Sequence, residues 1–157
     1  MWIPKKPKFY KAEGVWITIK ETLLPSYILA QCPDPWDLRH RIQDYQSTMG
    51  IHMVGRRPQE GEFDVIGEVT PEELDYIHIL CGDTSFGVKE GDTVTITSGP
   101  LVRLCGYIRK IDRHHRYALI DLPFMGKIIE VKAALEVVSA GPGAAEGPIA
   151  NILAKTH

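Results

Sequence analysis

The chain has 157 residues, of which 44% are hydrophobic and 24% are charged, and this composition excludes an intrinsically disordered protein. Its formal net charge of -2 excludes a protein that coats nucleic acid through overall positive charge, so any such contact must come from a local patch. No apolar run reaches the roughly 18 residues that a membrane span requires, so we expect a soluble, cytoplasmic protein without a membrane partner. The 3 cysteines lack Cys-x-x-Cys spacing, and we expect neither a metal nor another cofactor.

The first half of the chain mixes strand and helix signals. Residues 15–19 and 23–30 are rich in β-branched and aromatic side chains, so they predict two strands. Residues 34–45 predict a short helix, because apolar side chains recur at helical spacing and Pro35 suits the first turn. Residues 51–54 follow a glycine and predict a further strand.

A second helix has a well-defined start. Thr70 supplies an N-cap hydroxyl, Pro71 suits the first helical position, and Glu73 stands where a capping box places its carboxylate. Leu74 and Ile77 then follow at helical spacing. The sequence therefore predicts a helix that begins at Thr70.

The pattern changes after residue 82 to short strands separated by turns, with no helix expected. The predicted strands are 93–97, 106–111, 116–122, 127–132 and 135–138. Five short strands suffice to close a small SH3-like barrel, in which closure removes exposed strand edges. Residues 139–157 are rich in glycine and proline near their start and predict a flexible tail.

Residues 88–112 have the form of a KOW motif, in which a strand, a Gly-Pro loop and a second strand entered by glycine follow one another. The positions that carry this pattern are Gly91, Gly99, Pro100 and Gly106. Over residues 88–138 the chain resembles the C-terminal domain of NusG-type transcription elongation factors, especially paralogues of the LoaP kind. Val102 and Arg103 depart from the pattern, because family loops commonly continue with a small residue.

The resemblance extends more weakly upstream. Residues 1–4 are similar to a strand of the NusG N-terminal (NGN) domain, and residues 23–29 are similar to its Phe-Pro-Gly-Tyr-Val segment. Family members begin with a further strand and a long helix, so the resemblance implies a partial domain. A late start, completion by another chain and a degenerate copy would each explain it.

The implied fold is α+β, with two modules that have separate cores. Its parts are a partial NGN sheet-and-helix domain at 1–81, a linker at 82–87, a five-stranded SH3-like KOW barrel at 88–138 and the tail at 139–157. We expect the partial domain to be less stable than the barrel, because it lacks covering elements. Helices within residues 91–138, or a single core running through both halves, would contradict the two-module arrangement and the transcription-factor hypothesis that depends on it.

The resemblance implies RNA polymerase as a partner, bound at its clamp helices through an apolar depression. The positions that match are Leu24, Tyr27 and Leu29. Packing in the protein's own core is the stronger interpretation for Leu24 and Leu29, because every strand of a small sheet buries alternate residues. Tyr27 is the better polymerase candidate, since its ring can pack while its hydroxyl stays in water.

The second half carries a local excess of bases that suits RNA phosphates, including those of an RNA hairpin. The candidate RNA-binding residues are Arg103, Arg109, Lys110, Arg113, His114, His115 and Arg116. An ordinary solvated surface explains these residues equally well.

No catalytic motif is present, so we do not expect an enzyme. The leading hypothesis is a transcription elongation or antitermination factor that binds RNA polymerase through its first half and RNA or another factor through its second. A ribosome-associated KOW protein that binds RNA is the alternative, although stronger basicity would then be expected. A nonfunctional remnant is a third interpretation.

Overall fold

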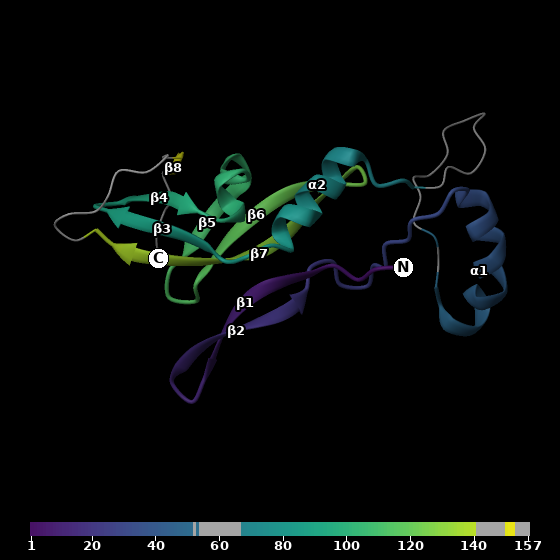
Figure 1. Ribbon diagram of the computed structural model, residues 1–157, viewed down its shortest axis with the longest axis horizontal. Coiled ribbons are helices and arrows are strands. Elements are labelled where there is room, and N and C mark those ends of the chain that lie inside the picture. The colour runs from purple at the N-terminus through teal and green to yellow at the C-terminus, as the bar shows by residue number, and fades with distance from the viewer. Residues whose placement is uncertain (52, 54–66, 141–149, 153–157) are drawn as a thin grey trace.

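The computed structural model describes the chain except for residues 52, 54–66, 141–149 and 153–157. The described part is mixed α and β, with a two-stranded sheet and a separate curled sheet (Figure 1). The strands are β1 (Lys5–Ala12), β2 (Val15–Thr22), β3 (Ser85–Glu90), β4 (Thr93–Ser98), β5 (Ile108–Asp112), β6 (Tyr117–Phe124), β7 (Lys127–Ser139) and β8 (Ala150–Ile152). The helices are α1 (Pro35–Met49) and α2 (Pro71–Leu80), with single 3-10 turns η1 (Pro100–Val102) and η2 (Cys105–Tyr107).

Strands β1 and β2 form an antiparallel hairpin that projects from the rest of the molecule (Figure 1). Its two-residue turn, Glu13 and Gly14, has positive φ at both positions, which matches the right-handed twist of the flanking strands. The predicted strand at 15–19 is confirmed as part of β2. Strand β1 was missed, because its four lysines and Pro7 are poor strand formers and it is stabilised by pairing with β2 and by contact with β7.

The strand predicted at 23–30 is wrong. After β2 the chain turns, and within this segment only Leu29 is in a bridge, with hydrogen bonds in both directions to the backbone of Trp2. Pro25 has no N–H to donate, and Ser26 lies at φ 71°, so neither residue can continue a ladder.

Both predicted helices are present. Helix α1 has Asp34 as its N-cap and runs past Tyr45 to Met49. None of the α1 side chains that the structure describes is buried, and the helix lies to one side of the molecule (Figure 1). No helix in the described part of the chain is both long enough and apolar enough to span a bilayer. Of the strand predicted at 51–54, the described residues 51 and 53 are not in a strand and the others lie outside the described residues.

The capping box of α2 is confirmed. The Glu73 N–H donates to the Thr70 hydroxyl at 3.2 Å, and the Thr70 N–H donates to the Glu73 carboxylate at 2.8 Å. That carboxylate also accepts the backbone N–H of Met125 at 2.6 Å, which ties the helix start to the turn between β6 and β7. Burial raises the pKa of Glu73, whereas these hydrogen-bond donors lower it. The donors have the larger combined effect, so the net pKa is below the ordinary value.

The curled sheet has the strand order β5-β6-β7-β3-β4-β8. Its longest strand, β7, replaces the two strands predicted at 127–132 and 135–138. It stays continuous because its first half pairs antiparallel with β6 and its second half pairs parallel with β3. Strand β3 was not predicted, and its start at Ser85 means that residues 85–87 are in the sheet rather than in a linker.

Smaller differences concern the middle of this sheet. The strand predicted at 106–111 begins at Ile108, because the residues before it form η2. The helical turns η1 and η2 contradict the expectation that this half of the chain contains no helix. The strands predicted at 93–97 and 116–122 are confirmed as β4 and β6, and β6 continues to Phe124.

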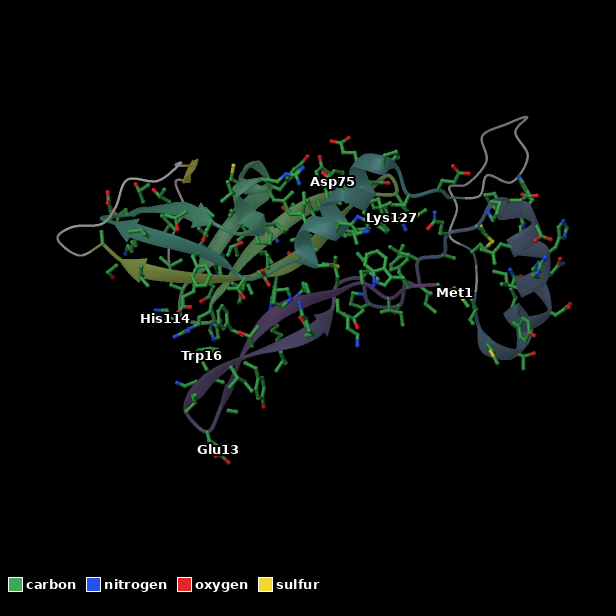
Figure 2. The ribbon with its side chains drawn as sticks, viewed as in Figure 1. Met1, Glu13, Trp16, Asp75, His114 and Lys127 are labelled. Carbon is green, nitrogen blue, oxygen red and sulfur yellow. The ribbon has the colours of Figure 1, made fainter. Side chains whose placement is uncertain are left out.

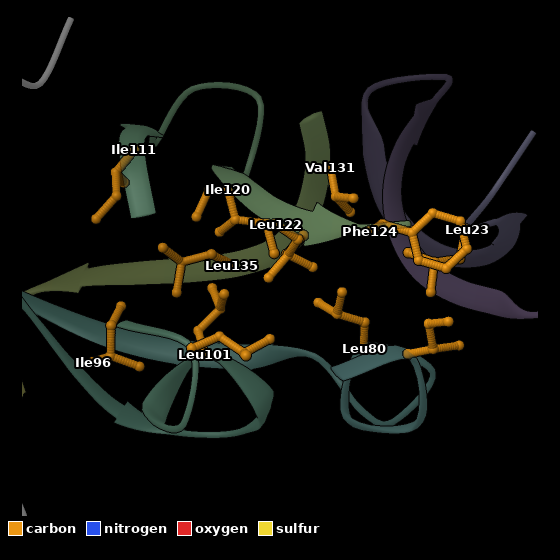
Figure 3. Close-up of a cluster of buried hydrophobic side chains, with 14 of the residues drawn as sticks. Leu23, Leu80, Ile96, Leu101, Ile111, Ile120, Leu122, Phe124, Val131 and Leu135 are labelled. Carbon is orange, nitrogen blue, oxygen red and sulfur yellow. The ribbon is translucent and has the colours of Figure 1, made fainter. Parts of the chain in front are cut away.

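One hydrophobic core runs through the predicted domain boundary (Figure 3). Leu23 and Leu24, together with Ile77 and Leu80 of α2, belong to the same buried cluster as the side chains of the curled sheet, such as Leu135. The expectation of separate cores is therefore wrong, and the transcription-factor hypothesis loses the two-module arrangement from which it was argued. A sheet of about 50 residues buries little surface by itself, and these four side chains extend the core that it can form.

Candidate functional site

An open groove of about 650 Å³ lies between the β1–β2 hairpin and the curled sheet, and we call it the hairpin–sheet groove. In Figure 2, Trp16 on the hairpin and His114 at the β5–β6 turn mark the two elements between which the groove lies. Four of its lining residues are aromatic and four are Lys or Arg. The lining residues are Phe9, Tyr10, Trp16, Tyr117, Lys8, Lys11, Arg116, Lys132, Glu21, Asp112, His115 and Ala134.

Glu21 joins the two strands of the hairpin near its base. Its carboxylate accepts hydrogen bonds from Lys6 and Lys8, each at 2.7 Å. Lys6 is only 5% exposed, so this pairing supplies the countercharge that a buried ammonium needs. The hydrogen bonds from Lys6 and then Lys8 lower the pKa of Glu21. The carboxylate is therefore ionised at neutral pH and holds β1 and β2 together.

Arg116 joins the hairpin to the sheet. Its guanidinium lies 4.9 Å from the centroid of the Trp16 ring and 5.4 Å from that of Phe9, both on the hairpin. On the sheet side it donates to Glu136 of β7 at 3.1 Å. Its backbone has φ 56°, which is uncommon for a residue other than glycine and occurs here in the β5–β6 turn. Arg116 therefore holds two aromatic rings in fixed positions at the groove wall.

Two lysines supply charge without a carboxylate partner. Lys11 lies 5.8 Å from the centroid of Trp16, and Lys132 lies 4.9 Å from the centroid of Tyr117. Neither forms an ion pair with any residue that the structure describes. The groove thus carries positive charge beside aromatic faces, in a protein whose net charge is -2.

Asp112 shapes the turn at the sheet side of the groove. It accepts the backbone N–H of His115 at 2.9 Å, and its second oxygen lies 2.8 Å from Nδ1 of the same residue. Burial raises the pKa of Asp112, but the His115 hydrogen bonds outweigh it and the net pKa falls. Burial, followed by the Asp112 charge, raises the pKa of Tyr117, so this phenol is neutral at pH 7.

The predicted RNA-binding residues do not form one site. Arg103 pairs with Asp75 at 2.8 Å, and Arg109 lies between Asp121 and Glu130, so carboxylates already balance these two cations.

Of the remaining five, only His115 and Arg116 line the groove. Lys110 is half-buried on β5, and His114 is exposed in the turn. The Nε of Arg113 is buried and has no hydrogen-bond partner among the described residues.

The predicted polymerase-binding residues lie at or near the core. Leu24 is 3% exposed, so it offers no surface to a partner. Tyr27 packs edge-on against Phe124, with ring centroids 5.8 Å apart, and Leu29 is half-buried against the same cluster. Ile28, between them, is 52% exposed.

The four positions that carry the KOW-like sequence pattern differ in what they do. Gly99 lies directly against Ser85, and Pro100 begins η1. Gly91 lies in the β3–β4 turn at φ 59°, whereas Gly106 lies in η2 with open space around it.

Sequence reasoning missed most of the groove. The signal was present in residues 8–11, where Lys, Phe, Tyr and Lys follow one another, because aromatics interleaved with bases are typical of nucleic-acid-binding surfaces. Lys132 carries no such local signal and joins the groove only through the fold. The described residues include no group of three or more His, Cys, Asp or Glu side chains that could hold a metal.

No protein-family model matches this chain, and no curated protein matches it.

Proposed function

We propose that the chain is an RNA-binding protein, and we infer from its resemblance to NusG-type factors, rather than from two separate modules, that it acts with RNA polymerase during transcription elongation or antitermination. The observation that carries this proposal is the hairpin–sheet groove, which combines aromatic rings with lysines that have no carboxylate partner among the described residues.

RNA suits the groove on two grounds. Lysines that neutralise phosphates release condensed counterions, and this drives association with a polyanion even when the protein is slightly acidic overall. Aromatic rings add stacking energy that an anion without a π face cannot use. The two carboxylates of the groove, Glu21 and Asp112, are already hydrogen-bonded to neighbours in the protein, which limits their repulsion of phosphates.

The role in transcription draws on the KOW-like segment. Strand β4, the Gly99–Pro100 loop and β5 follow one another as that motif requires, and β3 to β7 lie in one curled sheet, as an SH3-like barrel would need. The NGN-like part, including residues 23–29, would supply the polymerase contact. Leu23 and Leu24 share the core of the curled sheet, so a polymerase contact through residues 23–29 would also position the groove. Emerging RNA would then be at high local concentration near the groove.

The RNA proposal is tested by filter binding over a salt series. We expect the logarithm of the association constant to fall linearly with the logarithm of the salt concentration, and Lys132→Ser to reduce that slope by about one unit. Lys127→Ser is the matched control, since it removes the same charge from the same strand at the α2 end, outside the groove (Figure 2). A slope of zero, or equal slopes for the two variants, would contradict RNA binding at the groove.

The transcription role is tested by retention on immobilised RNA polymerase core. We expect Ile28→Ser to abolish retention, because this side chain is the exposed apolar group beside Tyr27. Val138→Ser is the control, since Val138 is similarly exposed but lies near the opposite end of the molecule on β7. Binding to ribosomes together with no retention on polymerase would favour the ribosome-associated alternative.

A further inference from the structure

We infer that the hairpin–sheet groove takes unpaired nucleotides of RNA, with bases stacked on its aromatic rings, in preference to base-paired RNA. This inference rests on the proposed RNA binding and assigns the class of RNA structure that the groove selects.

The aromatic rings of the groove are held in place yet remain accessible. Trp16 and Tyr117 are half-buried, and Tyr10 is 51% exposed, whereas aromatic rings in a hydrophobic core are shielded from solvent. They come from both walls, with Trp16 on β2 and Tyr117 on β6. A planar ligand entering the groove therefore meets aromatic surface from each side.

The rings are also preorganised. The Arg116 guanidinium lies over both Phe9 and Trp16 and is fixed in turn by Glu136. Side chains that are already ordered lose little rotamer freedom when a ligand binds, so more of the stacking energy appears as affinity. Lys11 and Lys132 lie over the Trp16 and Tyr117 rings, and neither is held by a carboxylate among the described residues. A base that stacks on either ring therefore displaces the flexible ammonium group toward its own flanking phosphates.

The concave shape favours single strands. In an A-form duplex the base faces are stacked on one another and the protein meets mainly the backbone and the 2′-hydroxyls. The groove is open to solvent, and its volume of about 650 Å³ lies in the range that small ligands occupy rather than the range that a helix needs. An unpaired nucleotide can place its base inside and leave its phosphates at the rim, and a paired one cannot.

Charge complementarity alone would also admit an acidic peptide, but the four rings favour a ligand with π faces. A glutamate side chain pairs with lysine and leaves the rings unused. Base stacking on such rings is tolerant of sequence, because every base has a π face. The groove should therefore distinguish unpaired from paired RNA more strongly than it distinguishes one base from another.

The test uses Trp16 as its own reporter. The chain has 3 tryptophans, so Trp2→Phe combined with Trp36→Phe leaves Trp16 as the one tryptophan, and excitation beyond the tyrosine absorption band makes its emission the signal. We expect a short oligouridylate to quench this emission on binding, and a fully paired duplex of equal length to bind at least tenfold more weakly with little quenching. This measurement needs no change within the groove itself.

A pair of substitutions then locates the stacking surface. Trp16→Leu keeps apolar bulk but removes the π face, and we expect it to weaken binding of the oligouridylate by roughly tenfold. Trp36→Leu is the matched control, because Trp36 also has a guanidinium over its ring, that of Arg39 at 5.4 Å, but lies on α1 outside the groove. We expect Trp36→Leu to bind as the wild type does, and both variants to keep the wild-type far-ultraviolet circular dichroism.

The outcomes separate the two proposals. If RNA binds but prefers duplex, leaves Trp16 emission unchanged, or binds the well-folded Trp16→Leu variant as tightly as the wild type, the inference is overturned and RNA binding itself stands. If polyglutamate displaces the oligouridylate at equal charge concentration, charge alone explains the groove and the inference is again wrong. If no RNA of either kind binds, the proposed RNA function fails first.

Discussion

Gly99 is the position where a single added methyl group should cost most. It lies at φ 88° and ψ -174°, a combination that side chains other than that of glycine essentially never adopt. A Cβ there would lie 2.6 Å from the Cα of Ser85 and 2.8 Å from both the Oγ of Ser85 and the carbonyl oxygen of Thr84. Two of these three atoms are backbone, so no side-chain rotation can relieve the contact.

The cost of Gly99→Ala has two parts. Holding alanine in this backbone region costs about 2 kcal/mol. Moving Ser85 adds about 1–2 kcal/mol, because its hydroxyl accepts the buried N–H of Leu101 at 2.9 Å and a shift weakens that hydrogen bond. The sum, about 3–4 kcal/mol, is a large share of the roughly 5–15 kcal/mol that stabilises an ordinary domain.

Urea unfolding followed by far-ultraviolet circular dichroism measures this loss, and two other glycines give it a scale. Gly91→Ala should cost about 1 kcal/mol, because Gly91 has φ 59° but nothing within 4 Å of an added Cβ. Gly106→Ala should be neutral or slightly stabilising, since that glycine has neither a positive φ nor a close neighbour. If Gly99→Ala were within about 1 kcal/mol of Gly106→Ala, the reasoning from the Ser85 contact would be refuted.

Three further predictions concern the core, the helix cap and the hairpin. Leu24→Ala should lower the free energy of unfolding by about 2–5 kcal/mol and Ile28→Ala by less than about 0.5 kcal/mol in the same urea assay; equal losses would contradict the burial of Leu24. Burial raises the pKa of Glu73 and hydrogen-bond donors lower it, and the net result is a lowered pKa. The ionised carboxylate therefore stabilises the fold at neutral pH, and this stabilisation is lost on acidification. Glu73→Gln should accordingly be less stable than wild type at pH 7, and urea unfolding should show the difference shrinking as the pH falls below about 4.3 rather than staying constant. Amides of residues 15–22 should exchange with deuterium faster than those of 117–124, because a two-stranded hairpin opens more easily than a central strand; equal protection would be the contrary result.

Elements with a local signal could be predicted from the sequence. Helix α2 is set by its capping box, helix α1 by Asp34 and Pro35, and β2 by its β-branched and aromatic residues. The coarse α+β class follows from these signals together. The limits of α1 were less certain, because nothing after Tyr45 marks an end until Gly50, whose left-handed conformation caps the helix.

Elements that depend on distant partners could not be predicted in this way. Strand β1 is rich in lysine and depends on its pairing with β2. Strand β7 is continuous because its first half pairs with β6 and its second half pairs with β3. The single core has the same origin, since Leu23 and Leu80 are far apart in sequence from Leu135 and meet it only after folding. An apolar pattern shows that these side chains will be buried but does not show against what.

The candidate site shows why a count of bases in a sequence is a poor measure of positive charge. Arg103, Arg109 and Arg116 all looked available for RNA, yet in the fold each donates to a carboxylate from another element. Such pairing leaves these cations structural, and Arg116 orients aromatic rings rather than supplying net charge.

The charge left over for a ligand comes instead from Lys11 and Lys132, which lie far apart in the sequence and on different sheets. Neither forms an ion pair among the described residues, and each lies over an aromatic ring that lines the groove. Since an ion pair with a neighbouring carboxylate largely cancels the field that a phosphate would feel, the effective positive surface of this protein is set by which bases the fold leaves unpaired. Removing only the opposing charge therefore makes a sharper test than deleting a base. Glu136→Gln keeps a side-chain oxygen that can accept the Arg116 hydrogen bond, so the rings stay in position while the countercharge is lost, and oligouridylate binding should strengthen. Lys11→Ser should weaken it. The filter-binding salt series measures both, and a weaker complex for Glu136→Gln would show that Arg116 matters through the position it holds and not through its charge.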